Sequence, residues 1–389
     1  MAKFLLLTHI YPPAVDGGSR VIAKMGEYLE KHGHEVLVVT SNCTSTDDYS
    51  KLKPTTISHP QKIISLPVIT IFHRPFKLLS RLLPNFKTFS KGPIFAYIPI
   101  FRIITYRPDY ILAGPLPTTI VLYARLIRFL AKTLFNYSPK LVINASFHPN
   151  DPDFQSSILL NTLKSAEYIW TLTDYETNYF QNNLSISQDK LLKLGNGVDK
   201  SFLLRTQILT HSTSNLLFIG SFSAHKNVET LIEAFKLLPS NYKLTLAGQK
   251  TLYFPVIQSL IKKLDSNISH RIKIIYSFPD TDLSKIIDSA DILISPSLQE
   301  SFGLILIEAM ARGKAVIAAN IPASIELINK SKSGLIFDSL KPIDLRDKIL
   351  NLSQKPKLSE TLGKNGLKFV SKYYIWDRIG DKLCQKLGI

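Results

Sequence analysis

The chain has 389 residues, a formal net charge of +17 and a hydrophobic fraction of 45%. This length exceeds one ordinary core and suits two domains of about 150 to 200 residues each. Cys43 and Cys384 lie far apart without a partner motif, which argues against a disulfide framework or a zinc site and fits a reducing cytosol. No uninterrupted apolar stretch approaches about 18 residues, so we expect no transmembrane helix.

The first half of the chain alternates apolar runs with amphipathic segments, the pattern of a parallel sheet covered by helices. The apolar run at residues 4–10 is too short for a signal peptide and lacks a cleavage pattern. We interpret it as the first strand. The sequence predicts strands at residues 4–8, 35–40, 110–113, 141–144 and 168–172, with a helix at 19–32.

Residues 49–150 are strongly basic, because Asp109 is the only acidic residue among fourteen lysines and arginines. Basic residues alternate with aromatic and aliphatic ones at 73–83 and again at 125–132. Such segments suit an anionic membrane surface. Nucleic-acid binding and charge that serves only solubility are the alternatives, although the usual nucleic-acid-binding motifs are missing from the sequence. We treat this range as a basic insert in the first domain.

A second alternating series begins at Asn215, and the polar stretch before it reads as a linker. The predicted strands are 216–219, 244–247, 272–276, 292–294, 315–318 and 334–337, and the predicted helices are 228–238, 256–264 and one that begins near Gly303. The fold class is therefore α/β, with two Rossmann-like domains at residues 1–205 and 206–370.

Glu300 and Glu308 lie eight positions apart on either side of a predicted helix start. If the helix begins near Gly303, backbone amides are exposed between the two carboxylates. Amides at a helix N-terminus bind phosphate, and a carboxylate accepts hydrogen bonds from sugar hydroxyls. The pair of glutamates could instead be a solvated helix face. The apolar strand and the Ser-Pro-Ser turn just upstream favour a ligand site, which would suit a nucleotide-sugar.

Two glycine-containing loops occupy equivalent strand-to-helix positions in the two halves. Gly17 and Gly18 follow the first strand and permit close backbone approach to a phosphate or a sugar, although a tight turn explains them equally well. In the second half, Lys226 stands just before a helix, where its ammonium could reach a diphosphate. A solvent-exposed lysine is the alternative.

His148 follows the end of a predicted first-domain strand and so would face a ligand. A lone histidine is often structural, but this place favours a role in binding a hydroxyl or in acid–base catalysis. The loop at residues 195–199 contains an Asn-Gly turn that needs no ligand to explain it.

The ordered set of motifs resembles the retaining GT-B glycosyltransferases of family 4 over nearly the whole chain. The motifs are Tyr11-Pro12-Pro13 with Gly17-Gly18, Gly33-His34-Glu35-Val36, Asn196-Gly197-Val198-Asp199, His225-Lys226-Asn227, and residues 300–310 followed by 311–317. This resemblance implies a GT-B fold, in which two Rossmann-like domains face each other across a cleft. It also implies that residues 371–389 form a C-terminal helix packing back on the first domain.

The resemblance also implies roles for individual residues. Lys226 neutralises the departing phosphate, Glu300 addresses the donor sugar, and His148 matches the family's first-domain histidine. The implied donor-binding residues are Gly17, Gly18, Ser221, Lys226, Ser277, Phe278, Glu300, Phe302, Gly303, Leu304 and Glu308. Among them Glu308 would hold the ribose, and the Tyr276-Ser277-Phe278 strand end would line the base.

Two features qualify this expectation. Many relatives carry an arginine where this chain has Ser221, which leaves Lys226 with less help. Asp280 and Asp282 have the spacing of a metal-binding loop, but their place before a predicted helix favours an N-cap. We therefore expect no metal and no cofactor besides the nucleotide-diphosphate-sugar donor.

The predicted function is that of a retaining hexosyltransferase, cytoplasmic and peripheral on the inner face of the cytoplasmic membrane. It would move a sugar to a lipid-linked or cell-surface polysaccharide or lipopolysaccharide acceptor, and we expect no nucleic-acid partner. The alternatives are a soluble glycosyltransferase with a small acceptor, and a non-catalytic GT-B scaffold that uses its basic face.

Overall fold

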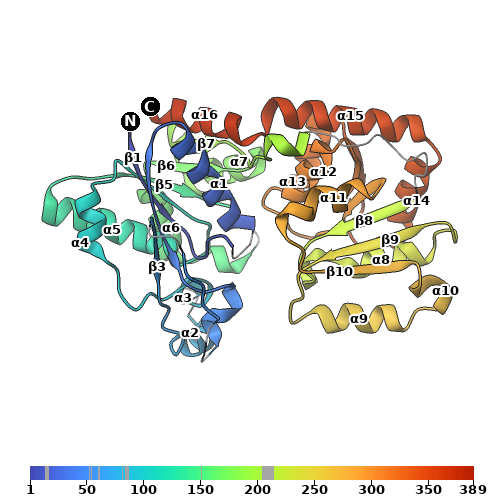
Figure 1. Ribbon diagram of the computed structural model, residues 1–389, viewed down its shortest axis with the longest axis horizontal. Coiled ribbons are helices and arrows are strands. Elements are labelled where there is room, and N and C mark those ends of the chain that lie inside the picture. Colours follow the sequence, from blue (N-terminus) through green and yellow to red (C-terminus); the bar gives the residue numbers. More distant parts are fainter. Residues whose placement is uncertain are drawn as a thin grey trace. The chain divides into compact units, whose positions relative to one another are not determined.

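The computed structural model describes residues 1–13, 17–51, 53, 55–59, 62–80, 82–83, 87–149, 151–203 and 214–389. The chain divides into two compact units (Figure 1). Unit 1 comprises Met1–Gly195 together with Trp376–Ile389, and unit 2 comprises Asn196–Ile375.

Unit 1 is built on a seven-stranded parallel sheet in the order β3-β2-β1-β4-β5-β6-β7. The strands are β1 (Lys3–Leu7), β2 (Glu35–Ser41), β3 (Ile63–Leu66), β4 (Tyr110–Ala113), β5 (Lys140–Asn144), β6 (Tyr168–Thr171) and β7 (Leu191–Lys193). The α-helices are α1 (Gly17–Lys31), α2 (His73–Leu79), α3 (Lys87–Lys91), α4 (Ile100–Tyr106), α5 (Ile120–Phe135), α6 (Ser157–Ser165), α7 (Asp174–Leu184) and α16 (Trp376–Leu387).

Both faces of this sheet are covered, which explains why its strands read as apolar runs without alternation. Leu5 and Leu7 pack with α5 on one face. Leu6 points to the other face, where α1 passes so close that a Cβ on Gly26 would lie 2.7 Å from the Leu6 side chain. Figure 1 shows α1 and α5 on opposite sides of the strands. Each such leucine contributes about 1.5 to 3 kcal/mol through burial.

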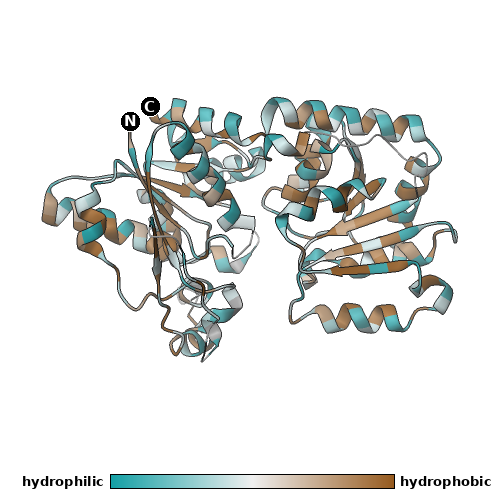
Figure 2. Ribbon diagram, in the orientation of Figure 1, coloured by the Kyte–Doolittle hydropathy of each residue, from teal (hydrophilic) through white to brown (hydrophobic). Residues whose placement is uncertain are grey.

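Unit 2 is built on a six-stranded parallel sheet in the order β10-β9-β8-β11-β12-β13. The strands are β8 (Asn215–Ile219), β9 (Lys243–Gly248), β10 (Ile272–Tyr276), β11 (Ile292–Ser295), β12 (Ala315–Ala319) and β13 (Gly334–Phe337). The α-helices are α8 (Val228–Lys236), α9 (Phe254–Lys262), α10 (Ser266–Ser269), α11 (Leu283–Asp288), α12 (Leu304–Ala311), α13 (Pro322–Ser331), α14 (Pro342–Ser353) and α15 (Pro356–Tyr373). Figure 2 shows the hydrophobic strands of the unit between helices with hydrophilic outer faces.

The α/β prediction is confirmed, and every predicted strand and helix with stated bounds up to residue 337 begins and ends within two residues of its observed counterpart. The C-terminal helix expected at residues 371–389 is shorter, because α15 continues to Tyr373 and α16 covers Trp376–Leu387. Two short edge strands, β3 and β7, were not predicted. The interpretation of residues 49–150 as an insert needs correction, because this range contains β4 and β5, which lie inside the sheet. Their burial between two helical layers requires apolar residues, whereas the basic residues cluster in the segments around them.

Unit 2 begins at Asn196, earlier than the predicted domain boundary. The Val198 amide donates to the Tyr374 carbonyl over 2.9 Å, and Arg312 donates to the Phe202 carbonyl, so this segment is held by unit 2. The predicted boundary after residue 205 and most of the predicted linker lie outside the described residues.

The C-terminal helix α16 packs on α1 within unit 1. The Tyr28 hydroxyl donates to Asp381 over 2.6 Å. Gly380 lies directly against the Tyr28 ring, where a Cβ would approach to 2.3 Å. In the described part of the chain, no helix is both long enough and apolar enough to cross a bilayer.

Candidate functional site

The order of strands in unit 2 reverses between β8 and β11, which are neighbours in the sheet. Ligands of open parallel sheets bind outside the strand C-termini at such a point. Two loops lie there, residues 220–227 after β8 and residues 296–303 after β11. They contain Lys226 and Glu300, so residues 74 positions apart in the chain meet at the position where the fold favours a ligand.

Three contacts join the two loops. Lys226 Nζ lies 2.5 Å from Glu300 Oε1. The Leu298 amide donates to the His225 carbonyl over 2.8 Å, and Asn227 Nδ2 donates to the Pro296 carbonyl over 3.1 Å. The two loops are therefore one preorganised structure, which is the condition for an electrostatic site that does not reorganise during a reaction.

Asn227 fixes the direction in which the first loop leaves the site. Its backbone is left-handed, with φ of 52°, a conformation that asparagine tolerates better than most residues. Its buried side chain also donates to the Ser339 carbonyl and accepts from the Thr230 hydroxyl. This set of contacts holds Lys226 at the end of a 3₁₀ turn, Ala224–Lys226, immediately before α8.

Glu300 is held as a carboxylate by its surroundings. Burial alone would raise its pKa, but the Lys226 ammonium, a hydrogen bond from the Ser297 hydroxyl and the nearby His225 together keep the pKa below its ordinary value of 4.5. Because the pKa is depressed in the folded state, the carboxylate contributes stability that is fully present above the unfolded pKa.

We expect this contribution to disappear in acid. Relative to a Glu300→Gln variant, wild-type protein loses free energy of unfolding as the pH falls below about 4.5 and passes through the folded pKa. Urea unfolding of both proteins between about pH 7 and pH 3 measures the difference. A difference that is constant over this range would show that the carboxylate is not held by Lys226.

The helix α12 begins as the spacing of the glutamates predicts. Gly303 is its N-cap residue, with φ of 92°, which a residue with a side chain adopts only under strain. The preceding Phe302 ring is buried and lies 5.3 Å from the Tyr374 ring. Phe302 therefore anchors the loop with its side chain, and the backbone amides of residues 302–304 lie at the start of α12.

Glu308 lies one turn into α12 and is 5% exposed. The other buried charge of this helix region, Arg312, is paired with Asp288. The opposite end of α12 is fixed by α15, where a Cβ on Gly366 would lie 3.0 Å from Met310. A buried carboxylate on a helix fixed in this way is positioned for a hydroxyl partner more accurately than one on a surface loop.

The remaining predicted site residues of unit 2 lie at the ends of β8 and β10. The Ser221 hydroxyl is 3.1 Å from that of Ser223, which is 3.3 Å from His225 Nδ1, so hydroxyl groups occupy the position of the expected arginine. Ser277 has a φ of 44°, and Phe278 follows it after β10, two strands from β8. Two strand spacings are about 10 Å.

In unit 1, the strand order reverses between β1 and β4. Gly17 and Gly18 form the first turn of α1, in the connection that follows β1. Gly18 lies against Pro115, after β4, and its Cβ would approach the proline ring to 2.4 Å. The two glycines therefore lie where the strand order of unit 1 reverses. The adjoining Asp16 lies outside the described residues.

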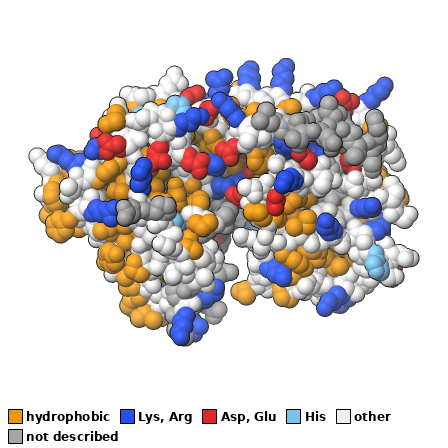
Figure 3. Space-filling view, in the orientation of Figure 1, with side chains coloured by type: hydrophobic (Ala, Val, Ile, Leu, Met, Phe, Trp, Pro, Cys, Tyr) orange, Lys and Arg blue, Asp and Glu red, His pale blue; other side chains and the backbone are white. Residues whose placement is uncertain are grey.

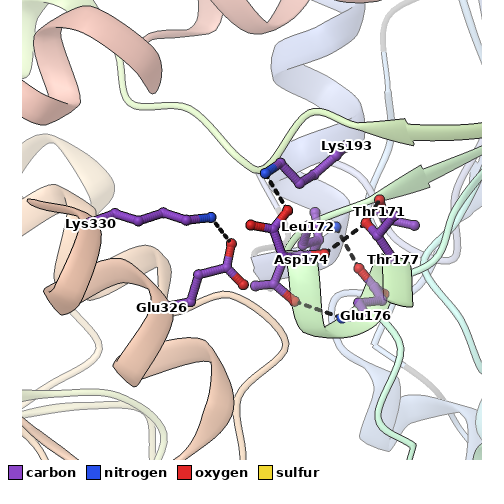
Figure 4. A network of polar contacts seen from close by, with 9 residues as sticks. Thr171, Leu172, Asp174, Glu176, Thr177, Lys193, Glu326 and Lys330 are labelled. Atoms are coloured by element: carbon purple, nitrogen blue, oxygen red, sulfur yellow. Dashed lines mark hydrogen bonds and ion pairs between the residues drawn. The ribbon is translucent and has the colours of Figure 1, made fainter. Parts of the chain in front are cut away.

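His148 lies in the loop after β5, and a buried carboxylate fixes this loop. Glu176 accepts hydrogen bonds from the amides of Phe147, over 2.6 Å, and Leu172, over 2.5 Å. Figure 4 shows Glu176 at the start of α7, beside the hydroxyl pair of Thr171 and Thr177. The imidazole of His148 is itself 5.3 Å from the Phe154 ring.

Sequence reasoning missed Glu176, although Thr173 followed three residues later by a glutamate is the signature of a helix start. The Thr173 hydroxyl does accept from the Glu176 amide. Asp282 occupies the N-cap position of α11, as predicted, although its side chain makes no cap hydrogen bond and lies 3.4 Å from Lys285 Nζ. Among the described residues, no three His, Cys, Asp or Glu side chains gather in a way that could hold a metal ion.

Residues 205–369 match the family model described as "Glycosyl transferases group 1". The second half of the chain therefore resembles the group 1 glycosyltransferases. An uncharacterized glycosyltransferase of Methanocaldococcus jannaschii is 30% identical over 214 residues, which are 55% of this chain and 57% of that relative. The O-antigen chain mannosyltransferase B of Escherichia coli is 25% identical over 285 residues, 69% of this chain and 71% of that one.

The fold of the chain is GT-B. It is similar over its whole length to Anabaena HepE, whose structure was solved in complex with UDP-glucose, with a TM-score of 0.72 and 15% identity over 100% of both chains. The glycosyltransferase family model ends close to the end of α15, and its range contains Ser221, Lys226, Glu300 and Glu308.

Proposed function

We propose that this protein is a retaining hexosyltransferase that takes its sugar from a nucleotide-diphosphate donor. The observation that carries the proposal is the ion pair between Lys226 and Glu300. It lies where the strand order of unit 2 reverses, beside the N-terminus of α12. A cation, free helix amides and a held carboxylate at one point match the diphosphate and hydroxyl groups of such a donor. The likeness to a protein solved with UDP-glucose supports it.

In the proposed reaction the bond between the sugar C1 and the diphosphate oxygen breaks as a new bond forms from the acceptor oxygen to C1 on the same face. The acceptor proton passes to the leaving diphosphate. Negative charge grows on that diphosphate, where the Lys226 ammonium and the amides of residues 302–304 stabilise it. Glu300 orients Lys226 and accepts from a sugar hydroxyl, and Glu308 accepts from the ribose. This scheme needs no metal or additional cofactor.

We propose that the acceptor is a lipid-linked or cell-surface glycan and that unit 1 binds it. Within unit 1, His148, fixed through Glu176, would contact the acceptor hydroxyl, and Gly17 and Gly18 would approach a phosphate or a sugar. The likeness to an O-antigen mannosyltransferase supports a polysaccharide or lipopolysaccharide acceptor. A small soluble acceptor is the alternative within this chemistry. A non-catalytic scaffold is the other, and Ser221 in place of an arginine is the observation that favours it.

Calorimetric titration of nucleoside diphosphates and nucleotide-sugars into the full chain tests the donor site. We expect at least one donor to bind, and we expect Glu308→Gln and Lys226→Ala each to weaken it about tenfold, because each removes one charged partner. Lys236→Ala, which removes an exposed lysine of α8, serves as the control. Binding that neither site variant affects would place the nucleotide elsewhere and contradict the proposal.

We propose that the protein is located at the inner face of the cytoplasmic membrane. The basic and apolar surface of unit 1 would hold it there. Phe101 on α4 is 75% exposed and Phe129 on α5 is 60% exposed. Basic residues lie among these aromatic ones on both helices, at Arg102 and Arg125. Figure 3 shows hydrophobic side chains gathered over the end of unit 1 that carries these helices. Aromatic and basic groups together suit an anionic bilayer.

Flotation with vesicles of phosphatidylcholine and phosphatidylglycerol measures this interaction. We expect wild-type protein to float at moderate salt and a Phe101→Ser/Phe129→Ser variant to lose most of its binding, since each ring loses its apolar burial in the bilayer. The control is Leu252→Ser in unit 2, where the side chain is 97% exposed. If wild-type protein does not float, the membrane location is wrong and a soluble acceptor is favoured.

A further inference from the structure

The C-terminal ends of β8, β9 and β10 form a ledge of closely spaced backbone in unit 2. These strands are neighbours in the sheet. A Cβ on Gly248 would lie only 1.7 Å from the Gly220 carbonyl oxygen, so a side chain there would collide with backbone. The Ser277 amide donates to the Gly248 carbonyl over 3.4 Å. The ledge therefore consists of tightly packed backbone at Gly220 and Gly248, where neither residue has a side chain.

The inner end of the ledge adjoins the proposed diphosphate site. A Cβ on Gly220 would lie 3.7 Å from Lys226 Cδ. The outer end is two strands away, at the end of β10, a distance of about 10 Å. A nucleoside diphosphate is extended, with its phosphates at one end and its base at the other. If the phosphates lie at Lys226, the base reaches the end of β10.

An aromatic ring and a lysine occupy this outer end. Tyr276 is 38% exposed, and its ring packs edge to face against Phe254 with centroids 5.2 Å apart. Lys250 Nζ lies over the Tyr276 ring, 4.0 Å from its centroid. Phe254 holds the tyrosine ring in place from one side, while the lysine, on the loop after β9, is exposed. The ring face is thus covered by a movable cation, not by fixed structure.

We propose that Lys250 discriminates between donor bases that stack on Tyr276, the strand end expected to line the base. It selects bases with a carbonyl at C4 of a pyrimidine or C6 of a purine, uracil and guanine, over cytosine and adenine, which carry an amino group there. This inference rests on the proposed donor function. It adds a residue that discriminates between donor nucleotides.

The selection follows from hydrogen-bonding chemistry. A base that stacks on Tyr276 displaces the ammonium from the ring face to the rim, and the attraction between cation and ring is lost. A lysine ammonium is only a donor, so it can replace that interaction with a bond to a carbonyl oxygen. The exocyclic amino group at the same position of cytosine or adenine is also a donor. Displacing the exposed Lys250 is then compensated only by water.

The test compares matched nucleotides. We expect UDP to bind the full chain at least tenfold more tightly than CDP, and GDP at least tenfold more tightly than ADP, by calorimetry. In Lys250→Met, which keeps the length of the side chain and removes its charge, both ratios fall below threefold. Lys273→Met removes an equal charge from exposed β10 and leaves the ratios unchanged. In Tyr276→Ala all four nucleotides bind more weakly by a similar factor.

Each other result overturns the inference in a recognisable way. Nucleotides that bind without these preferences, or preferences that persist in Lys250→Met, reject the role of Lys250 and leave the donor site intact. If Tyr276→Ala binds every nucleotide as wild type does, the base lies elsewhere. If none of the four nucleotides binds wild-type protein, the proposed donor function itself fails, and the inference fails with it.

Discussion

Replacing Lys226 by alanine is expected to slow sugar transfer by about a hundredfold or more, which corresponds to about 3 kcal/mol of transition-state stabilisation. Lys226 is expected to contribute this much because its ammonium is held by Glu300 and by the ordered turn at Asn227. It is therefore in place before charge develops on the leaving diphosphate. Water that fills the space of the lost side chain must reorganise during the reaction and stabilises that charge less well.

The variant also leaves the buried Glu300 carboxylate without its cation, so activity alone does not separate the two effects. A Lys226→Ala/Glu300→Gln protein removes both charges and tests whether transfer recovers. Lys236→Ala is the control, because its partner Glu233 lies on the exposed face of α8. Initial rates with saturating and limiting donor give kcat and kcat/KM. A loss below threefold in Lys226→Ala would remove this lysine from the mechanism.

Replacing Glu176 by alanine is expected to lower the free energy of unfolding of unit 1 by about 3 kcal/mol. The carboxylate is 1% exposed and accepts from the amides of Phe147 and Leu172. Both amides then lose a charged acceptor in a place where water enters poorly. The loop that carries His148 would also lose its attachment to α7, so transfer should fall together with stability.

Glu176→Gln tests charge and shape separately in this experiment. Glutamine keeps the shape of the side chain, but it has one oxygen that accepts hydrogen bonds from the two backbone amides, where the carboxylate has two. We expect it to cost less than Glu176→Ala but more than the control Glu233→Ala, which breaks only an exposed pair. Urea unfolding followed by circular dichroism gives the free energies. If Glu176→Ala unfolds at the same urea concentration as wild type, the carboxylate does not hold the loop.

Much of the fold could be predicted because the two central sheets are buried on both faces. A strand such as β11 or β12 must then be apolar throughout, which makes it visible without knowledge of its neighbours. The edge strands β3 and β7 escaped prediction because their apolar runs are short, Ile63–Leu66 and Leu191–Lys193. The insert at 49–150 was drawn from the charge of this range alone, although the strands at 110–113 and 141–144, which are β4 and β5, had been predicted inside it.

The site was predictable only where its residues are close in sequence. Glu300 and Gly303 could be placed because a helix start relates them, and the left-handed backbone at Gly303 explains why glycine stands there. Glu176 was not foreseen, because its contact with Phe147 spans 29 positions. The contact of Asn227 with Pro296 spans 69 positions. Such contacts depend on the order of the strands, which a single sequence does not reveal.

The most direct test of the central claim is a transfer assay with labelled nucleotide-sugars and a membrane fraction that contains lipid-linked glycans. We expect label from one donor to enter the lipid-linked fraction, with the anomeric configuration of the donor retained in the product and with little transfer by Lys226→Ala. Inverted configuration would contradict the proposed front-face reaction. No transfer from any nucleotide-sugar, with folded protein and active acceptor present, would contradict the assignment of the enzyme activity itself.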